Sequence, residues 1–348
     1  MGCSADTGLF ESRLPRGVNN TITDVAGVTV GHCTINEGDI KTGVTAILPH
    51  PGNIYREKLP AGHAVFNGFG KSTGLMQLAE LGTLETPIIL TNTLNVGTAF
   101  SAVVRYSLEK NKDIGVKTGT VNPVICECND GQLSDIRGMH IAEEHVFEAI
   151  RNAGTAFEEG NAGAGCGMSC YGFKGGIGSA SRVLTVGRTK YTTGVLVLTN
   201  YGNKQDFRIM GHRVAEKQAP TIDKGSVIVI IATDAPLTDR QLNRVSRRAV
   251  AGLCRSGATI GHGSGELAIG FSTAYRIPHY AASGKPLEEH PNLHESYMDH
   301  IFAATVESVE DAVFSSLIHA ETTTGIRGKR IVSLTEFLQN GEQRTVLK

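Results

Sequence analysis

Residues 257–274 read Gly-Ala-Thr-Ile-Gly-His-Gly-Ser-Gly-Glu-Leu-Ala-Ile-Gly-Phe-Ser-Thr-Ala. In the middle of this stretch, Ser264 stands between Gly263 and Gly265, ahead of an apolar run, Leu267 to Phe271, that is typical of a buried strand. Glycine on both sides permits unusual backbone dihedrals and leaves the hydroxyl sterically open. The pattern has two interpretations. One is a glycine turn that enters a strand, which is the commoner case; the other is a strained peptide bond ahead of a nucleophile.

The composition limits the classes of protein to consider. The 348 residues suffice for one large domain or two ordinary ones, and the 42 glycines exceed the usual share of ~7%. A net charge of −1 provides no excess of positive charge of the kind that indicates nucleic-acid binding. The longest apolar run, Val227 to Ala232, is too short to span a membrane. An odd number of cysteines, seven, predicts reduced thiols in a cytoplasmic protein.

Three motifs that would indicate a metal or a nucleotide have the wrong spacing. His140 and His145 are five residues apart, whereas zinc-protease helices place their histidines four apart. Gly70-Lys71-Ser72 ends like a P-loop, but Val65 occupies the position of the first glycine of that motif. Zinc sites favour C-x₂-C pairs, a spacing that is not found among Cys126, Cys128, Cys166 and Cys170. We therefore expect no metal and no cofactor.

Strands and helices are expected to alternate irregularly, with neighbouring strands often separated only by turns. This pattern argues against a doubly wound parallel sheet and favours mostly antiparallel sheets covered by helices. The expected strands are 24–35, 42–48, 63–67, 87–91, 123–128, 182–186, 193–198, 227–232 and 267–271. The main expected helices are 75–81, 96–110, 140–152, 237–256, 297–321 and 334–339.

Polar side chains stand at the ends of three expected strands. They are Glu127 with Asn129, Asn200, and Ser264 at a strand start. Asparagine at a strand end is often only a turn former, and no G-x-S-x-G elbow is present to mark a hydrolase triad. Cleavage of the Gly263–Ser264 bond would supply a base, because the new α-amino group, with a pKa near ~7.7–8.0, would sit on the nucleophilic residue itself.

The motifs together resemble the L-aminopeptidase/D-Ala-esterase/amidase family, which includes the β-peptidyl aminopeptidases. The resemblance covers roughly Asn19 to Gly325, and its motifs occur in order. They are Thr-Gly-Val-Thr-Ala-Ile-Leu-Pro (42–49), Asn-Gly-Phe-Gly-Lys-Ser-Thr-Gly (67–74), Glu-Cys-Asn-Asp-Gly (127–131), Phe-Lys-Gly-Gly (173–176), Thr-Asn-Tyr-Gly (199–202), Ala-Thr-Asp-Ala-Pro (232–236) and Gly-His-Gly-Ser-Gly-Glu (261–266).

The resemblance implies an α+β fold, an αββα sandwich like that of the N-terminal-nucleophile hydrolases but with different connectivity. It implies one self-processing domain over residues 1–348, cut between Gly263 and Ser264 into an α chain, 1–263, and a β chain, 264–348. Ser264 would then be the nucleophile of an aminopeptidase that acts on a small peptide, amide or ester. The resemblance also implies no cofactor and a homo-oligomer, often a tetramer of processed protomers.

The resemblance further assigns roles to the other candidate residues. Asn200 matches the oxyanion-hole asparagine, and Glu127 matches the acidic residue that holds the free amino group of the substrate. Asn129 lies at a substrate-binding position where the family varies. On the last long helix, Thr305 and Glu307 match a hydroxyl-x-Glu pair that orients the nucleophile and its amine in the family.

Two other functions stay open at this point. One is an acyltransferase of the ornithine acetyltransferase type, which shares the fold but uses threonine as its new N-terminus. The other is an unprocessed binding protein that kept the scaffold without the activity.

Overall fold

The computed structural model describes residues 11–214, 225–284 and 286–340. Two β-sheets form its centre. The smaller sheet has four strands in the order β1–β2–β5–β6, of which only the β5–β6 pair is parallel. The bounds of its strands are β1 Thr29–Glu37, β2 Ile40–Leu48, β5 Ile88–Asn92 and β6 Val124–Cys128.

The larger sheet has seven strands, in the order β15–β3–β14–β13–β10–β9, with β4 also paired to β3. Its central pair, β13–β14, is parallel and the other pairs are antiparallel. The bounds are β3 Glu57–Gly68, β4 Thr83–Leu84, β9 Ile177–Val186, β10 Thr189–Asn200, β13 Ser226–Thr233, β14 Gly265–Ser272 and β15 Ile277–Pro278.

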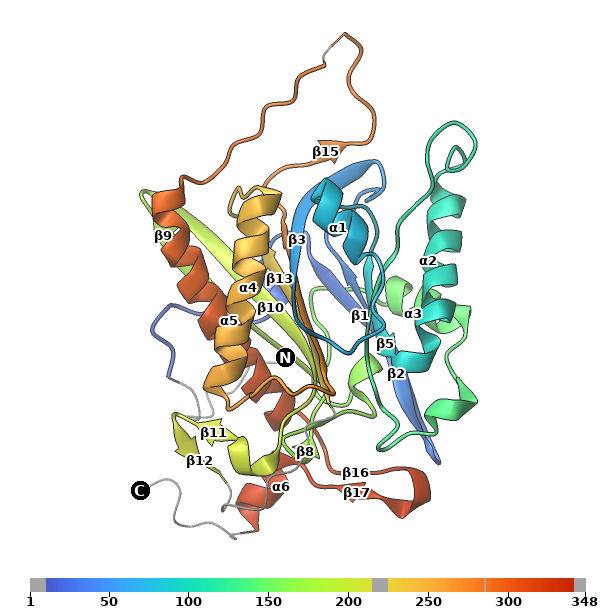
Figure 1. Ribbon diagram of the computed structural model, residues 1–348, viewed down its shortest axis with the longest axis vertical. Helices are drawn as coiled ribbons and strands as arrows, with labels where there is room; N and C mark the ends of the chain where they lie inside the picture. The colour runs from blue at the N-terminus through green and yellow to red at the C-terminus, as the bar shows by residue number, and fades with distance from the viewer. Residues whose placement is uncertain (1–10, 215–224, 285, 341–348) are drawn as a thin grey trace.

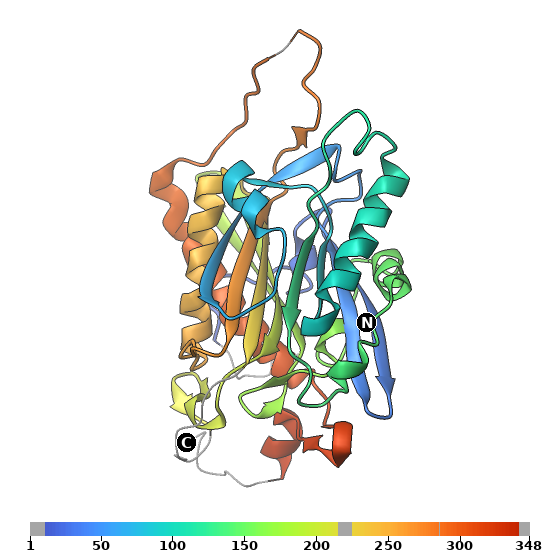
Figure 2. The ribbon, with the colours of Figure 1, turned by 45° about the vertical axis from the view of Figure 1, so that its right-hand side comes forward.

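Helices cover the outer face of each sheet, which gives the αββα order of layers (Figures 1 and 2). Helices α4 (Asp239–Arg255) and α5 (Met298–Ile318) pack on the seven-stranded sheet, and α2 (Val96–Lys110) and α3 (Glu143–Arg151) pack on the four-stranded sheet. The remaining described α-helices and strands are short. They are α1 Leu75–Leu81, α6 Leu334–Gln339 and the strand pairs β7 Ser169–Cys170 with β8 Phe173–Lys174, β11 Arg208–Ile209 with β12 His212–Arg213, and β16 Thr323–Thr324 with β17 Arg330–Ile331.

Three hydrophobic clusters separate the four layers, and strand alternation explains them. In β13, Val229 packs under α4 and α5, whereas its neighbours Ile228 and Ile230 face the core between the two sheets. In β5, Ile89 packs under α2 and α3, whereas Leu90 faces the same inter-sheet core. A strand covered on both faces reads as a continuous apolar run, and this is why β13 was recognisable in the sequence.

The α+β fold class and the αββα layers agree with the sequence-based expectation. The hairpin of β9 and β10 and the helix at residues 96–110 are confirmed. No described helix is long and apolar enough to cross a membrane.

Candidate active site

One end of the seven-stranded sheet carries a row of small and polar residues. Asn200, the last residue of β10, pairs with Ser226, the first residue of β13. Ser226 pairs in turn with Gly265, the first residue of β14, and Gly265 pairs with Gly68 of β3. The parallel pairing of β13 and β14 puts the starts of both strands at this end, although 38 residues separate them in the chain.

Strand alternation indicates which way Asn200 and Ser226 face. Two residues from each of them, Leu198 and Ile228 lie in the core between the sheets. Asn200 and Ser226 therefore stand on the face of the sheet that looks toward the four-stranded sheet. Both side chains are buried, so this end of the sheet is a sheltered polar position.

The side chain of Asn200 is held by two backbone groups. Its Oδ1 accepts a hydrogen bond from the Ser169 amide at 3.0 Å, and its Nδ2 donates to the Asn129 carbonyl at 2.9 Å. An amide nitrogen carries two protons, so one N–H of Asn200 remains for a ligand. A donor fixed in this way, on the strand beside Ser226, suits a developing oxyanion.

Glu127 reaches the same region from β6 of the other sheet. Its Oε1 accepts a hydrogen bond from the Lys71 amide at 2.9 Å, and its Oε2 accepts one from the Thr93 hydroxyl. A Cβ built on Gly70 would lie 3.6 Å from Oε1 of Glu127 and 3.6 Å from the Cα of Gly265. The carboxylate therefore lies just across Gly70 from the start of β14, and a carboxylate is a suitable partner for an ammonium group.

A second Gly-Ser pair, which the sequence reasoning missed, begins the central strand. A Cβ on Gly225 would overlap the carbonyl oxygen of Asn200, so only glycine fits ahead of Ser226. Burial raises the pKa of the Cys128 thiol, the charges of Glu127 and Glu266 raise it further, and a hydrogen bond with Ser226 lowers it. Ser226 therefore lies close to the β6 segment that carries Glu127. The sequence feature that could have identified Ser226 is the Gly-Ser pair directly before the apolar run 227–232.

Ser264 lies on the other side of Ser226 from Asn200. It immediately precedes Gly265, so strand β13 separates Ser264 from Asn200. Ser264 is fully buried, its amide donates to the Gly261 carbonyl at 3.2 Å, and its carbonyl accepts a bond from the Asn67 side chain. The buried Glu266 follows two residues later, opposite Val227 of β13.

Thr305 and Glu307 do not join this cluster, which corrects the expectation from the sequence. The Thr305 hydroxyl donates within its own helix, to the Ile301 carbonyl. Glu307 pairs with the buried Arg182 of β9 at 3.3 Å. Arg182 lies opposite Thr193, which is seven residues along β10 from Asn200. At the ~3.4 Å rise of a strand, this is a separation of roughly 24 Å. Helix α5 crosses the sheet, and its Thr305 and Glu307 lie over the far end.

Asn129 is at the expected place, beside the cluster. Its carbonyl holds Asn200, and its side-chain oxygen accepts the Gly131 amide at 2.9 Å in the turn after β6. The side chain is exposed. Its role in binding substrate stays a prediction.

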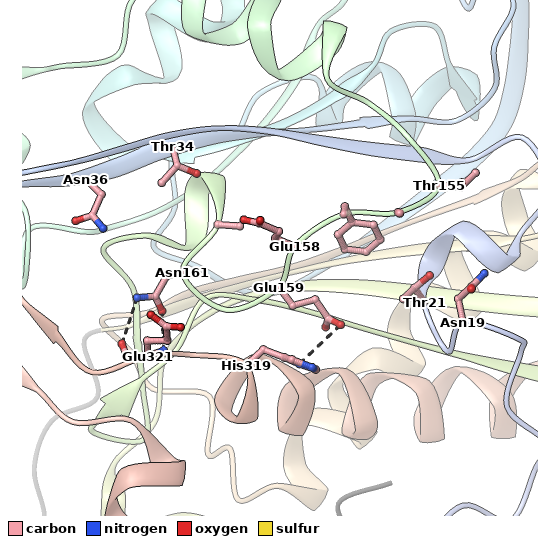
Figure 3. A pocket seen from close by; sticks show the side chains of 13 residues that line it. Asn19, Thr21, Thr34, Asn36, Thr155, Glu158, Glu159, Asn161, His319 and Glu321 are labelled. Atoms are coloured by element: carbon pink, nitrogen blue, oxygen red, sulfur yellow. Dashed lines mark hydrogen bonds and ion pairs between the residues drawn. The ribbon is translucent and has the colours of Figure 1, made fainter. Parts of the chain in front are cut away.

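A cavity of about 810 Å³ lies apart from the cluster, between β1, residues 155–162 and the end of α5 (Figure 3). None of the residues described above lines it. Glu159 points toward His319 in this cavity, and it accepts hydrogen bonds from the Ser179 amide and the Ser315 hydroxyl, both at 2.6 Å. Burial raises the pKa of Glu159. These contacts tie the loop to β9 and α5, which is a structural role.

Comparison with known proteins is consistent with this geometry. The profile of peptidase family S58 matches residues 20–331. The β-peptidyl aminopeptidase BapA of Sphingosinicella xenopeptidilytica is 39% identical over 347 residues, covering 91% of this chain and 85% of BapA.

Two solved structures are also similar. A Pyrococcus horikoshii protein superposes with a TM-score of 0.90 at 50% identity, covering 95% of this chain and 96% of that one. The L-aminopeptidase D-Ala-esterase/amidase of Ochrobactrum anthropi, described as a prototype of the serine aminopeptidases and a variant of the Ntn-hydrolase fold, gives 0.88 at 35% identity, covering 95% of each chain. The chain therefore belongs to peptidase family S58 and is an aminopeptidase with an Ntn-hydrolase-like fold.

Proposed function

We propose that the protein is a self-processing N-terminal serine aminopeptidase whose nucleophile is Ser226. The row Asn200–Ser226–Gly265 carries this proposal, because a nucleophile and its oxyanion donor must reach the same carbonyl group. Ser226 is directly opposite Asn200, whereas Ser264 is separated from Asn200 by a whole strand. Adjacent strands are ~4.8 Å apart, so Ser226 is the better placed of the two serines.

In this proposal the precursor is cut between Gly225 and Ser226, which gives chains 1–225 and 226–348. The Ser226 hydroxyl attacks the Gly225 carbonyl, the peptide nitrogen leaves as the new α-amino group, and water hydrolyses the resulting ester. The freed amine then acts as the base for the hydroxyl of the same residue. This boundary replaces the one expected from the sequence.

Ser264 and Glu266 then take the role first expected of Thr305 and Glu307. Ser264-Gly265-Glu266 is also a hydroxyl-x-Glu pattern, and it lies on the strand next to Ser226. A hydroxyl and a carboxylate that flank the start of β13 are suited to hold an ammonium group there and to orient it.

The substrate has a free amino group in this reaction, and Glu127 holds it. Ser226 attacks the carbonyl of the first residue, Asn200 donates to the oxyanion, and the amine of Ser226 protonates the leaving group. Water then hydrolyses the acyl-enzyme. Peptides, amides and esters all fit this chemistry, and the names of the relatives suggest β-aminoacyl, L-aminoacyl and D-alanyl substrates.

We also propose a cytoplasmic location, since all six described cysteines are free thiols.

Intact mass of the purified protein tests the proposal. Cleavage before Ser226 divides the 37.0 kDa chain into 225 and 123 residues, or roughly 24 and 13 kDa by residue share, as release of an N-terminal nucleophile requires. Ser226→Ala should stay whole. Ser264→Ala should be cut at the same bond, but more slowly, because it keeps the nucleophile and loses an orienting hydroxyl.

Other masses would decide against this assignment. Fragments of roughly 28 and 9 kDa, the residue share of a cut before Ser264, would make Ser264 the N-terminal nucleophile. A wild-type chain that stays whole after long incubation would contradict the self-processing mechanism altogether. Activity on an aminoacyl p-nitroanilide, lost when the amino group is acetylated, would test the aminopeptidase reaction separately.

A further inference from the structure

The side chain of Lys174 is fully buried, and the reaction proposed above does not use it. It belongs to the Phe-Lys-Gly-Gly motif, residues 173–176. A buried lysine is ordinarily paired with a carboxylate, but Lys174 forms no ion pair with any residue in the described ranges. Burial lowers the pKa of its amine to about 7, so the amine reduces the stability of the fold near neutral pH. An apolar side chain would avoid this cost, and the contacts of the amine must explain its presence.

The amine of Lys174 binds two backbone carbonyl groups. Its Nζ donates to the Gly165 carbonyl at 2.9 Å and to the Gly175 carbonyl at 2.7 Å. These two residues lie near the ends of residues 165–176, which we call the glycine loop. Glycine loses more conformational freedom on folding than any other residue, so a segment rich in glycine needs additional bonds to keep one conformation. The two bonds of Lys174 join the ends of the loop.

Within the glycine loop, Lys174 lies opposite the residue that binds Asn200. Strands β7 and β8 form a short hairpin in which Ser169 pairs with Lys174, and the hairpin packs against β10. The Gly175 amide donates to the Met168 carbonyl at 3.2 Å, so the pair of Ser169 and Lys174 makes no ladder bonds of its own and its amides point out of the hairpin. The Ser169 amide donates to Oδ1 of Asn200 at 3.0 Å.

The bond from the loop determines the direction in which the side-chain amide of Asn200 points. Its oxygen and its NH₂ belong to one planar group, so a bond at Oδ1 also orients the protons of Nδ2. The loop is joined to β10 on both sides of this residue. The Thr199 amide donates to the Gly176 carbonyl at 2.9 Å, and the Tyr171 amide donates to the Tyr201 carbonyl at 2.7 Å. A shift of the loop would therefore turn the N–H that faces the oxyanion.

We propose that Lys174 is a positioning residue for the oxyanion donor, because its amine holds the glycine loop whose Ser169 amide orients Asn200. This inference rests on the role that we propose for Asn200. Lys174 acts through two hydrogen bonds and one backbone amide, and it removes no reacting group when it is replaced. A misplacement of about 1 Å can cost ~10²-fold in rate, so a loosened loop should lower kcat.

Substitution of Lys174 tests the proposal. In Lys174→Met, we expect kcat per processed molecule, counted by intact mass, to fall about 10- to 100-fold. KM should change less than about threefold, because the ground-state carbonyl needs the Asn200 bond less than the oxyanion does. Lys174→Gln keeps an N–H donor and should lose less activity than Lys174→Met. A purely structural role would lower the thermal unfolding midpoint of both variants and leave kcat unchanged.

Lys41→Met is the matched control. Lys41 is also buried, but its amine donates to the Asn36 side chain at 2.6 Å and not to the glycine loop. Its replacement removes a buried amine and its hydrogen bond without loosening the contact with Asn200. We expect its kcat to stay close to the wild-type value, whatever its effect on the unfolding midpoint.

A double-mutant cycle decides whether Lys174 acts through Asn200. If it does, adding Lys174→Met to Asn200→Ala should change kcat by less than about twofold, because the donor that Lys174 positions is already absent. An equal fold loss in both backgrounds would overturn the proposal, and so would a Lys174→Met enzyme with the wild-type kcat. If Lys174→Met gives no folded and processed protein, Lys174→Gln takes its place in the same cycle.

The same measurements separate this inference from the proposed function. An Asn200→Ala enzyme with the wild-type kcat would contradict the oxyanion role itself, and the role of Lys174 would fall with it. A slow Asn200→Ala enzyme beside an unaffected Lys174→Met enzyme would contradict the role of Lys174 alone.

Discussion

At the scale of single residues, we expect the hydrogen-bonded side-chain amide of Asn200 to make the largest contribution to the reaction rate. Replacing Asn200 with Ala removes the donor on the strand beside Ser226, and loss of one oxyanion donor typically lowers kcat by ~10²–10³. We expect KM to change little, because the ground-state carbonyl needs this bond less than the oxyanion does. Asn161→Ala is the matched control, since Asn161 also makes side-chain bonds, to Glu321 and Thr323, but far from the cluster. Equal kcat values for the two variants would contradict the assignment.

Glu127, in contrast to Asn200, should affect how the free amino group of the substrate is bound. Glu127→Gln keeps an acceptor for the Lys71 amide but removes the negative charge that faces a substrate ammonium. Hydrogen bonds to charged groups contribute ~1.5–3 kcal/mol, so kcat/KM for substrates with a free amino group should fall about 10- to 100-fold. Self-cleavage should continue, because the precursor has no free amine at that position. Steady-state kinetics and intact mass measured on one preparation separate the two effects, and loss of self-cleavage would show that Glu127 does more than bind.

At the scale of elements, the sequence predicted which segments form strands and helices but not which strands are neighbours. Apolar runs and turn signals marked β13 and β14 separately. Their parallel pairing depends on a crossover through α4, which local pattern does not encode. Asn200 and Glu127 were recognisable from their motifs, whereas the central place of Ser226 follows only from this pairing. The family resemblance assigned an orienting role to Glu307 because it matched a hydroxyl-x-Glu pair, although α5 carries Glu307 to the far end of the sheet.

The contacts of Glu307 predict a role in holding elements together. Glu307 and Asp311 of α5 both pair with the buried Arg182 of β9, and Glu307 also accepts the amides of Arg13 and Leu14. Breaking a buried ion pair is strongly destabilising, so Glu307→Gln should lower the free energy of unfolding by on the order of 3 kcal/mol. We expect kcat and self-cleavage to stay close to wild type.

A neighbouring carboxylate provides the control for this prediction. Glu310 is one turn along α5 and pairs with the half-exposed Arg255, a type of pair that contributes about 1 kcal/mol or less. Glu310→Gln should therefore unfold near the wild-type denaturant concentration. A Glu307→Gln protein that is stable but cleaves or turns over slowly would restore the orienting role expected from the sequence.

At the scale of the whole molecule, the site depends on how the two sheets are held together. Glu127 belongs to the four-stranded sheet, and Asn200 and Ser226 belong to the seven-stranded sheet. The inter-sheet core, with Leu90, Leu198 and Ile228, fixes their relative position. A buried charge where the sheets meet should therefore affect the stability of the entire fold, and Asp130, two residues after β6, is such a group.

Burial raises the pKa of Asp130 to about 7, whereas an aspartate in the unfolded chain titrates near ~3.9. Between these two values the folded protein binds the proton more tightly than the unfolded chain, so stability falls as pH rises from about 4 to about 7. Asp130→Asn removes this dependence. Its advantage over wild type should be small near pH 4 and should grow to at most about 4 kcal/mol above pH 7.

Thermal unfolding midpoints of the two proteins at pH 4.5, 6 and 8 measure this difference. The partly buried His32, whose pKa burial lowers to about 4, destabilises the fold as pH falls below ~6.5. It therefore affects wild type and variant equally and cancels in the comparison. Asp135→Asn is the control, because the Asp135 side chain is 40% exposed and pairs with His140 at 3.1 Å. If Asp130→Asn were less stable than wild type at pH 8 and equal to it at pH 4.5, the Asp130 carboxylate would have to be a favourable ion in the folded protein, with a pKa below its ordinary range.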